Sequence, residues 1–212
     1  MKAFTLNHKR YVQSIYSKHS PIVIGVGPAG CGKTYIACTT AIQQLLKKDV
    51  SKIIITRPTA NVDEEHGFLP GSIEDKMEPY LNPIYDCFLE SISKQQLKKY
   101  LSDDTINICP LGFMRGRTFN NAIIIADETQ NTTKMQMKML LTRIGRESKM
   151  VITGDVDQSD IGCENGLQDI LKKIDNQFNE KDESIIDVIE FEQPDILRNE
   201  IVMKVLDLYK YY

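Results

Sequence analysis

The sequence contains no tryptophan, only three histidines and only five cysteines among its 212 residues. The cysteines are odd in number and form no Cys-x-x-Cys pair, so neither a disulfide framework nor a cysteine-based zinc site is expected. No apolar run approaches the roughly 20 residues of a membrane-spanning helix. The first dozen residues lack the apolar core of a signal peptide. These absences predict a cytoplasmic protein without membrane contact.

An excess of charge of one sign is also missing. Lysine and arginine total 26 against 29 acidic residues, which gives a net charge of −3. The whole chain therefore shows no general attraction to nucleic acid or to anionic membranes, although a local basic patch is compatible with this balance. The apolar and charged contents, 42% and 26%, are typical of a globular protein. The length predicts a single domain over residues 1–212.

The glycine-rich segment GPAGCGKT, residues 27–34, is the most informative feature of the chain. It has the Walker A spacing of two glycines followed by Lys33 and Thr34. An apolar run, Ile22–Val26, precedes it and a helix-like stretch, Tyr35–Lys48, follows it. Glycines allow successive N–H groups to surround phosphate oxygens, and the helix start adds its positive dipole end. The alternative, a glycine-rich turn with a chance Lys-Thr pair, is disfavoured by this strand–loop–helix context.

The motif predicts a role for each of its residues. Lys33 is placed to contact the β- and γ-phosphates, and the Thr34 hydroxyl to bind Mg²⁺. Cys31 has either a pKa lowered by the helix start or a packing role as a small residue. The predicted nucleotide contacts are Gly27, Pro28, Ala29, Gly30, Cys31, Gly32, Lys33, Thr34 and Tyr35.

Apolar runs alternate with helical patterns, which predicts an α/β domain with a mainly parallel sheet. Pro79 and Pro83 predict a break in the otherwise helical region 73–91. Residues 57–72 lack periodicity and are predicted to form a long loop. Such long loops in compact domains are often functional. The predicted strands are Ile22–Val26, Lys52–Thr56, Thr105–Cys109, Ala122–Ala126, Lys149–Thr153 and Ile185–Phe191. The predicted helices are Asn7–Lys18, Lys33–Lys48, Gln95–Leu101, Thr133–Ile144, Gly166–Asn176 and Leu197–Tyr209.

Two further polar clusters end predicted strands. Asp127 and Glu128 follow the run Ile123–Ala126, where Asp127 is placed to organise Mg²⁺ and Glu128 to polarise an attacking water. Gln158 follows the next strand and is placed to bind the water or the γ-phosphate. Because ligands bind beyond the carboxyl ends of parallel strands, the clusters should share one crevice. The alternatives are a solvated acidic turn for the pair and a surface side chain for Gln158.

The segments GPAGCGKT, ITRP, HGFLPG, PLGFMRGRTFNNAIIIADETQNTTKMQMKMLLTRIG and KMVITGDVDQSDI together resemble the PhoH family. The family consists of ATPases related to the first RecA-like domain of superfamily 1 helicases, and the resemblance extends from about Thr5 to Tyr209. It implies a three-layer RecA-like P-loop NTPase fold with ATP and Mg²⁺ as cofactors. The implied site residues are Lys33 and Thr34 for phosphate and metal, Asp127 and Glu128 as the Walker B pair, Gln158 as the γ-phosphate sensor and Arg198 as the arginine finger.

Two positions depart from the family pattern. Cys31 stands where threonine is usual, an exchange that preserves size. His8 stands near the start where an Asn-Gln pair is usual, and that glutamine reads adenine. The choice between ATP and GTP is therefore open, and Tyr11 is an alternative contact that stacks on the base.

A chain with one RecA-like domain either acts alone as a switch or assembles so that a neighbour completes each site. The second alternative is favoured, and it predicts a homo-oligomer, in one form a ring. Arg198 then acts in trans, with Arg57, Arg143 and Arg146 as competing fingers. Single-stranded RNA or DNA is predicted to contact Arg57 after the second strand and the basic loop residues Arg115 and Arg117, which have Phe113 and Phe119 nearby. The alternative partners of these arginines are phosphate or internal carboxylates.

The combined features predict an ATPase coupled to binding or remodelling of single-stranded nucleic acid. Two alternatives stay open. One is a P-loop kinase that acts on a small acceptor, against which the Gln158 segment speaks because a kinase needs no water sensor. The other is a nucleotide-gated module that binds a partner and hydrolyses slowly.

Overall fold

The computed structural model describes most of the chain, and for residues 73–80 it describes the backbone alone. The described residues are 4–58, 73–162, 164–177, 185–197, 201, 202 and 204. Residues 59–72 of the predicted long loop 57–72 therefore lie outside the described residues. Most of the predicted helix Leu197–Tyr209 also lies outside the described residues.

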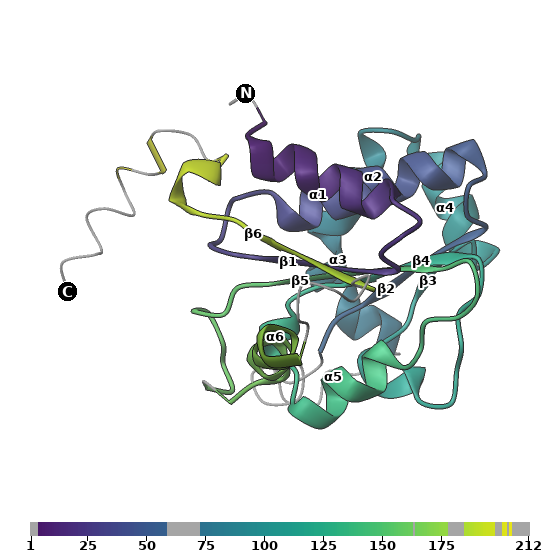
Figure 1. Ribbon diagram of the computed structural model, residues 1–212. Coiled ribbons are helices and arrows are strands. Elements are labelled where there is room, and N and C mark those ends of the chain that lie inside the picture. Colours follow the sequence, from purple (N-terminus) through teal and green to yellow (C-terminus); the bar gives the residue numbers. More distant parts are fainter. Residues whose placement is uncertain are drawn as a thin grey trace.

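Within this described part, six parallel strands form one sheet in the order β3-β2-β4-β5-β1-β6 (Figure 1). The predicted α/β class with a parallel sheet is confirmed, and each predicted strand is found within one or two residues of its expected bounds. Near-continuous apolar runs mark such strands because both faces of the sheet are buried. The strands are β1 (Ile22–Val26), β2 (Lys52–Thr56), β3 (Ile106–Ile108), β4 (Ala122–Ala126), β5 (Lys149–Gly154) and β6 (Ile186–Glu190).

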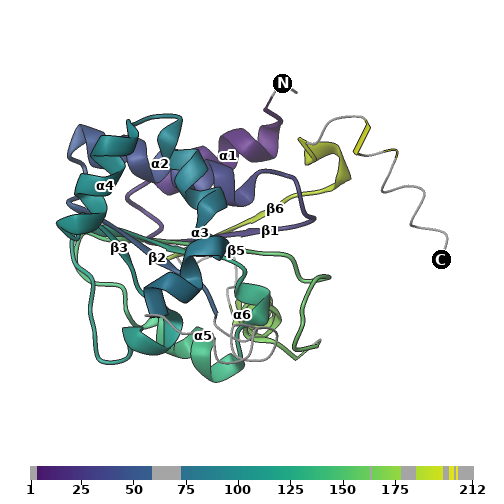
Figure 2. The ribbon, with the colours of Figure 1, turned by 180° about the vertical axis from the view of Figure 1, so that it is seen from behind.

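Helices cover both faces of the sheet, as Figures 1 and 2 show for opposite views. The helices are α1 (Leu6–Tyr16), α2 (Lys33–Lys47), α3 (Ile73–Leu89), α4 (Lys94–Ser102), α5 (Lys134–Leu141) and α6 (Gly166–Gln177). Short 3₁₀ turns are η1 (Leu111–Met114), η2 (Thr129–Asn131) and η3 (Gln193–Asp195). Capping boxes begin α1 at Thr5 and α5 at Thr133. In each box the threonine side chain accepts a hydrogen bond from the backbone N–H three residues later, and the side chain of that later residue accepts one from the backbone N–H of the threonine.

The alternation of side chains along each strand divides the core in two. In β4, Ile123 and Ile125 face the core formed with α1, α2, α3 and α4, whereas Ile124 faces the core formed with α5 and α6. All three isoleucines are fully buried. This arrangement gives the three-layer architecture and directs the carboxyl ends of all six strands to one end of the sheet.

The predicted break at Pro79 and Pro83 is wrong, because α3 runs without interruption from Ile73 to Leu89. Its described apolar face explains the difference: Leu81, Ile84 and Phe88 are all buried in the core that α3 shares with α2. Burying three such side chains contributes about 5–9 kcal/mol, which offsets the roughly 6 kcal/mol that two prolines cost inside a helix, at about 3 kcal/mol each. Tertiary packing therefore outweighs the local signal.

The predicted helix Thr133–Ile144 is too long, because α5 ends at Leu141. Beyond it the chain turns back to the sheet, and Ile144 forms an isolated parallel bridge with Phe119. Within the described residues, no helix combines the length and apolar character that crossing a bilayer requires.

Candidate functional site

The loop between β1 and α2 is shaped by its glycines. Gly27, Gly30 and Gly32 have positive φ angles of 141°, 84° and 83°, which side chains rarely tolerate. A Cβ on Gly27 would also lie 2.3 Å from the carbonyl oxygen of Phe191. Gly32 is the N-cap of α2 and supplies no capping side chain. The first N–H groups of α2 are therefore available to an anion.

Lys33 lies folded against this loop. Its Nζ donates to the carbonyl oxygens of Gly27 at 2.6 Å and Pro28 at 3.0 Å, and the residue is only 9% exposed. Phosphate oxygens are stronger acceptors for an ammonium group than neutral carbonyls are. The loop thus holds a positive charge next to the N-terminus of α2, where a phosphate group would bind.

Cys31 is a buried packing residue of the loop. Burial raises the pKa of its thiol, and the neighbouring Lys33 ammonium opposes that shift only in part. Of the two alternatives from the sequence, the packing role fits this environment. Cys87 on α3 differs, because a hydrogen bond with the Cys38 thiol lowers the pKa of Cys87, and it is only half-buried.

We expect iodoacetamide to modify Cys87 at least about tenfold faster than Cys31 at neutral pH, because the thiolate is the reactive form. Peptide mass spectrometry after a short reaction measures the difference residue by residue. Cys109 serves as the internal control, since it is buried and its thiol pKa is likewise raised. Faster labelling of Cys31 than of Cys87 would contradict the packing role of Cys31.

Asp127 joins the ends of three strands. Its Oδ1 accepts a hydrogen bond from Thr34 Oγ1 at 2.7 Å and another from the Thr153 hydroxyl. Its Oδ2 accepts from Arg57 Nε at 2.9 Å and from a second guanidinium nitrogen of the same residue. The predicted metal residues Thr34 and Asp127 are thus in direct contact, although 93 positions separate them.

Glu128 begins the turn after β4 in a strained conformation. Its φ of 57° is left-handed, an uncommon value for a residue with a side chain and one that is concentrated at functional sites. Gln130 holds its carboxylate, since Nε2 donates to Oε2 of Glu128 at 2.6 Å. The same amide accepts from the N–H of Asp155 at 3.1 Å. Gln130 therefore links Glu128 to the end of β5.

Gln130 was missed by the sequence analysis. It is buried and satisfied by two hydrogen bonds, but its only sequence signal is a polar side chain two positions after an acidic pair. An exposed turn would carry the same signal. Thr153 was missed for a similar reason, since a threonine near the end of a strand is ordinary.

A cavity of about 300 Å³ collects the predicted groups at the carboxyl ends of the strands. Its lining includes Gly30, Lys33 and Thr34 from the loop and the start of α2, and Asp127, Glu128, Asp155 and Gln158 from the segments after β4 and β5. Larger hollows of about 620 Å³ and 530 Å³ lie beside β6 and near Lys149 at the start of β5. Neither collects the strand-end clusters, so the smaller cavity is the candidate site.

His8 and Tyr11 do not line this cavity. His8 is fully buried, its Nε2 lies 2.9 Å from the carbonyl oxygen of Cys31, and its Nδ1 accepts from the N–H of Thr5. Tyr11 is also fully buried beneath β1, where a Cβ on Gly25 would lie 2.9 Å from the tyrosine ring. The structure gives both residues packing roles around the loop and leaves the base-reading residue unassigned.

The C-terminal part of the described chain also supports the loop. The N–H of Leu197 donates to the carbonyl oxygen of Gly30 at 2.9 Å. In Figure 1 the segment after β6 lies beside the start of α1, and Asp195 accepts hydrogen bonds there from Thr5 Oγ1 and Asn7 Nδ2. Arg198, the predicted finger, lies outside the described residues.

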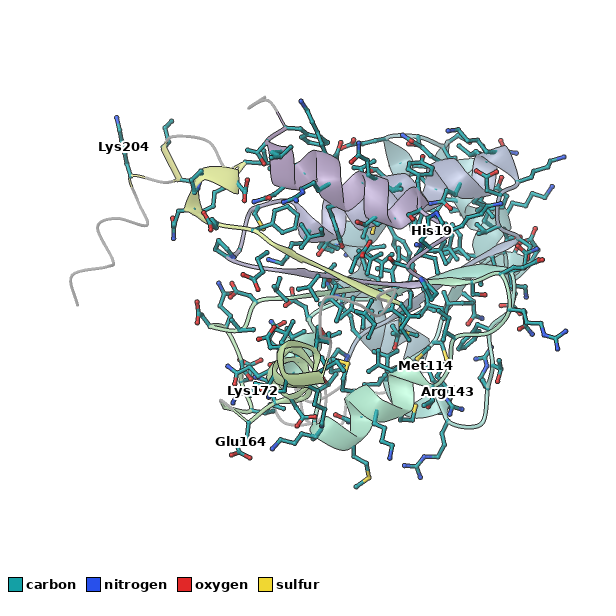
Figure 3. All side chains as sticks on the ribbon, in the orientation of Figure 1. His19, Met114, Arg143, Glu164, Lys172 and Lys204 are labelled. Atoms are coloured by element: carbon teal, nitrogen blue, oxygen red, sulfur yellow. The ribbon has the colours of Figure 1, made fainter. Side chains whose placement is uncertain are left out.

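The other predicted arginines occupy different places. Arg143 bonds the carbonyl oxygens of Met139 and Arg117, and Figure 3 shows it across the molecule from the loop after β1. Arg146 lies at the end of the sheet where the strands begin, because its carbonyl oxygen accepts a hydrogen bond from the N–H of Asn121, the residue just before β4. Arg117 contacts Cys109 Sγ and stacks on Phe119, and Arg115 is exposed. Neither of these two lines the cavity.

Residues 1–210 match the sequence model of the family PhoH, described as PhoH-like protein. The chain belongs to the PhoH family. It is 44% identical over 213 residues to the PhoH-like protein of Mycobacterium tuberculosis (strain ATCC 25618 / H37Rv), an alignment that covers 98% of this chain and 57% of the relative. It is 41% identical over 210 residues to the PhoH-like protein of Bacillus subtilis (strain 168), covering 97% and 62%.

Protein PhoH of Escherichia coli (strain K12) is 38% identical over 203 residues, covering 94% of this chain and 55% of that protein. The chain thus spans between about half and two thirds of the length of these relatives. Among solved structures, the Pif1 helicase from Candida albicans matches 98% of this chain and 44% of its own, with 14% identity and a TM-score of 0.42. PhoH membership, the parallel sheet and the glycine-rich loop after β1 together give the predicted P-loop NTPase fold with a nucleotide-binding site.

Proposed function

We propose that this PhoH domain hydrolyses ATP with Mg²⁺. The observation that carries the proposal is the 2.7 Å hydrogen bond between Thr34 and Asp127, which joins the Walker A segment to the acidic pair. Glu128 and Gln158 line the same cavity as these two residues. A site that only held a nucleotide would not need a second acid and an amide beside the phosphate position.

The side chains present fit Mg²⁺. The described residues contain no group of three or more His, Cys, Asp or Glu side chains that could enclose a metal. Mg²⁺ prefers one or two protein oxygens together with phosphate oxygens and water, and Thr34 and Asp127 offer such oxygens. When bound, the ion would offset the negative charge of the phosphates.

The remaining roles follow from position. Lys33 and the N–H groups at the start of α2 bind the β- and γ-phosphates, since both are positive and face the cavity. Glu128 accepts a proton from the attacking water, while Gln130 keeps its carboxylate oriented. Gln158 is exposed at the rim and binds the water through its amide. A kinase would need no such pair of water-directed side chains.

We propose in addition that single-stranded nucleic acid, RNA or DNA, stimulates this turnover. The supporting feature lies on η1, after the carboxyl end of β3, where the Phe113 side chain is 59% exposed and Arg115 is exposed two positions later. An exposed ring beside a cation suits stacking on a base with contact to its phosphate. Arg57, in contrast, forms an ion pair with the Asp127 carboxylate. An internal carboxylate was the alternative partner that the sequence suggested for this arginine.

We propose that the active species is a homo-oligomer. Within the described residues, the lining of the cavity includes Lys33 but no arginine. A neighbouring subunit would then offer the arginine, with Arg198 as the candidate, to stabilise charge in the transition state. Particle mass measured by light scattering with and without ATP tests this assembly, and a monomer in both conditions would oppose it.

The proposed function is tested by measuring phosphate release from ATP and from GTP, with and without Mg²⁺, single-stranded RNA and single-stranded DNA. We expect turnover that needs Mg²⁺ and that rises with at least one of the two nucleic acids. Nucleotide binding without turnover under any condition would contradict hydrolysis and support the nucleotide-gated binding module instead. Equal turnover with and without both polymers would refute the nucleic-acid coupling alone.

Replacing Gln130 with alanine should lower kcat by about ten- to a hundredfold, a part of what a general base supplies, because Glu128 loses its orienting partner. Nucleotide affinity should change less than about twofold, since Gln130 is not among the residues that line the cavity. Gln95→Ala, at an exposed position on α4, is the matched control. A loss of affinity with unchanged kcat would assign Gln130 to binding.

A further inference from the structure

The Asp127 carboxylate, the predicted metal ligand, already has a cation as its partner. Two nitrogens of the Arg57 guanidinium donate to its Oδ2. The side chains of this pair are 15% and 2% exposed, respectively. Water therefore screens the pair only weakly, and the interaction is stronger than that of an exposed ion pair.

The sheet itself builds this contact. Arg57 directly follows β2, and Asp127 directly follows the neighbouring strand β4, where Thr56 is paired with Ala126. The N–H of Asp127 donates to the carbonyl oxygen of Thr56 at 3.0 Å, which extends the ladder by one step. The backbone register thus places the two charges next to each other, so the pair is a fixed part of the fold.

A divalent cation at Thr34 and Asp127 would meet this guanidinium. Oδ1 of Asp127 already accepts hydrogen bonds from the Thr34 and Thr153 hydroxyls, and the two bonds that Arg57 donates to this carboxylate go to Oδ2. One carboxylate carries one negative charge, and the arginine has already compensated it. A second cation near the same carboxylate is repelled by the first, so each cation lowers the affinity of the carboxylate for the other.

We propose that Arg57 competes with Mg²⁺ for Asp127, and so sets the magnesium concentration that the nucleotide site requires. The inference rests on the proposed Mg²⁺–ATP site, and it assigns Arg57 a role in adjusting that site. Weakening the arginine contact makes the carboxylate available to the metal, and strengthening it withdraws the carboxylate.

The test measures metal binding directly. Mn²⁺, a paramagnetic substitute for Mg²⁺, is titrated into protein that contains a non-hydrolysable ATP analogue, and free Mn²⁺ is counted by electron paramagnetic resonance. We expect Arg57→Gln to lower the half-saturating Mn²⁺ concentration by about five- to fiftyfold, which lies within the usual range of about 5–150-fold for coupled sites. Arg57→Lys, which keeps the charge but loses the two-nitrogen contact, should give a smaller shift in the same direction.

Arg10→Gln is the matched control, because Arg10 is exposed on α1 and should leave the value unchanged. The shift from Arg57→Gln should persist in high salt, since a buried pair is poorly screened. If Arg57→Gln raises the half-saturating concentration or leaves it unchanged, the inference is wrong, and Arg57 positions Asp127 for the metal or has no effect on it.

Arg57→Lys decides the matter if Arg57→Gln does not fold, because any value at or above that of the unmodified protein overturns the inference. Failure of the unmodified protein to bind Mn²⁺ with the analogue would refute the proposed function itself, and the inference with it. Normal binding without a shift in the variants refutes the inference alone.

Discussion

Lys33→Ala is expected to abolish nucleotide binding at practical concentrations. The ammonium of Lys33 is the cation that lines the cavity on its loop side, and it bonds the carbonyl oxygens of Gly27 and Pro28. Its removal takes away the charge that faces the phosphates and leaves those carbonyls without their donor. We expect affinity to fall at least about thirtyfold, since truncating a buried charge that contacts another charge costs about 2–5 kcal/mol.

Isothermal titration with ATP and Mg²⁺ measures this loss. Lys98→Ala, on the exposed face of α4, removes an equal charge away from the cavity and should leave affinity unchanged. Circular dichroism shows whether the variant stays folded, so that lost binding is not confused with lost structure. Affinity within threefold of the unmodified protein, a difference of about 0.7 kcal/mol, would mean that the cavity does not bind the triphosphate.

Glu128→Gln should separate binding from hydrolysis. The amide has the size of the carboxylate and can still accept the hydrogen bond from Gln130, so the left-handed turn after β4 is preserved. It cannot accept a proton from water, because an amide oxygen is a very weak base. We therefore expect kcat to fall by about 10²–10⁴-fold while ATP affinity stays within about twofold.

Single-turnover phosphate release and nucleotide titration together test this separation. Glu164→Gln is the matched control: the Glu164 side chain is 83% exposed and forms a surface ion pair with Lys134, which contributes little to stability. Turnover by Glu128→Gln at the normal rate would show that Glu128 is not the base. A nearby acid such as Asp155, which also lines the cavity, would then become the candidate.

The sheet was predictable from the sequence because strands buried on both faces consist almost entirely of apolar residues, as Ile53–Ile55 and Ile123–Ile125 do. The errors arose where tertiary contacts decide the outcome. α3 continues past Pro79 and Pro83 because its buried face is well packed. α5 ends at Leu141, and Ile144, which was predicted to be helical, instead bridges to Phe119. Neither contact has a local signal.

The members of the candidate site were predictable, but several of their contacts were not. A spacing pattern identifies Lys33 and Thr34, and an acid after an apolar run identifies Asp127. The pairing of Arg57 with Asp127 depends on the register between β2 and β4, which join segments far apart in sequence. The burial of His8 depends on how α1 packs against the loop. Such facts appear only once the strands are placed.

The dependence of the glycine-rich loop on distant segments has a consequence for synthesis of the chain. The ribosome makes residues 27–34 well before the residues that support them, which supply the hydrogen bond from Leu197 to Gly30 and the contact of Phe191 with Gly27. Until β6 has been made, β1 lacks its outer neighbour and is an open edge of the sheet. A chain stalled before β6 is therefore exposed to pairing with other unfinished chains, and the phosphate loop is completed only as the edge closes.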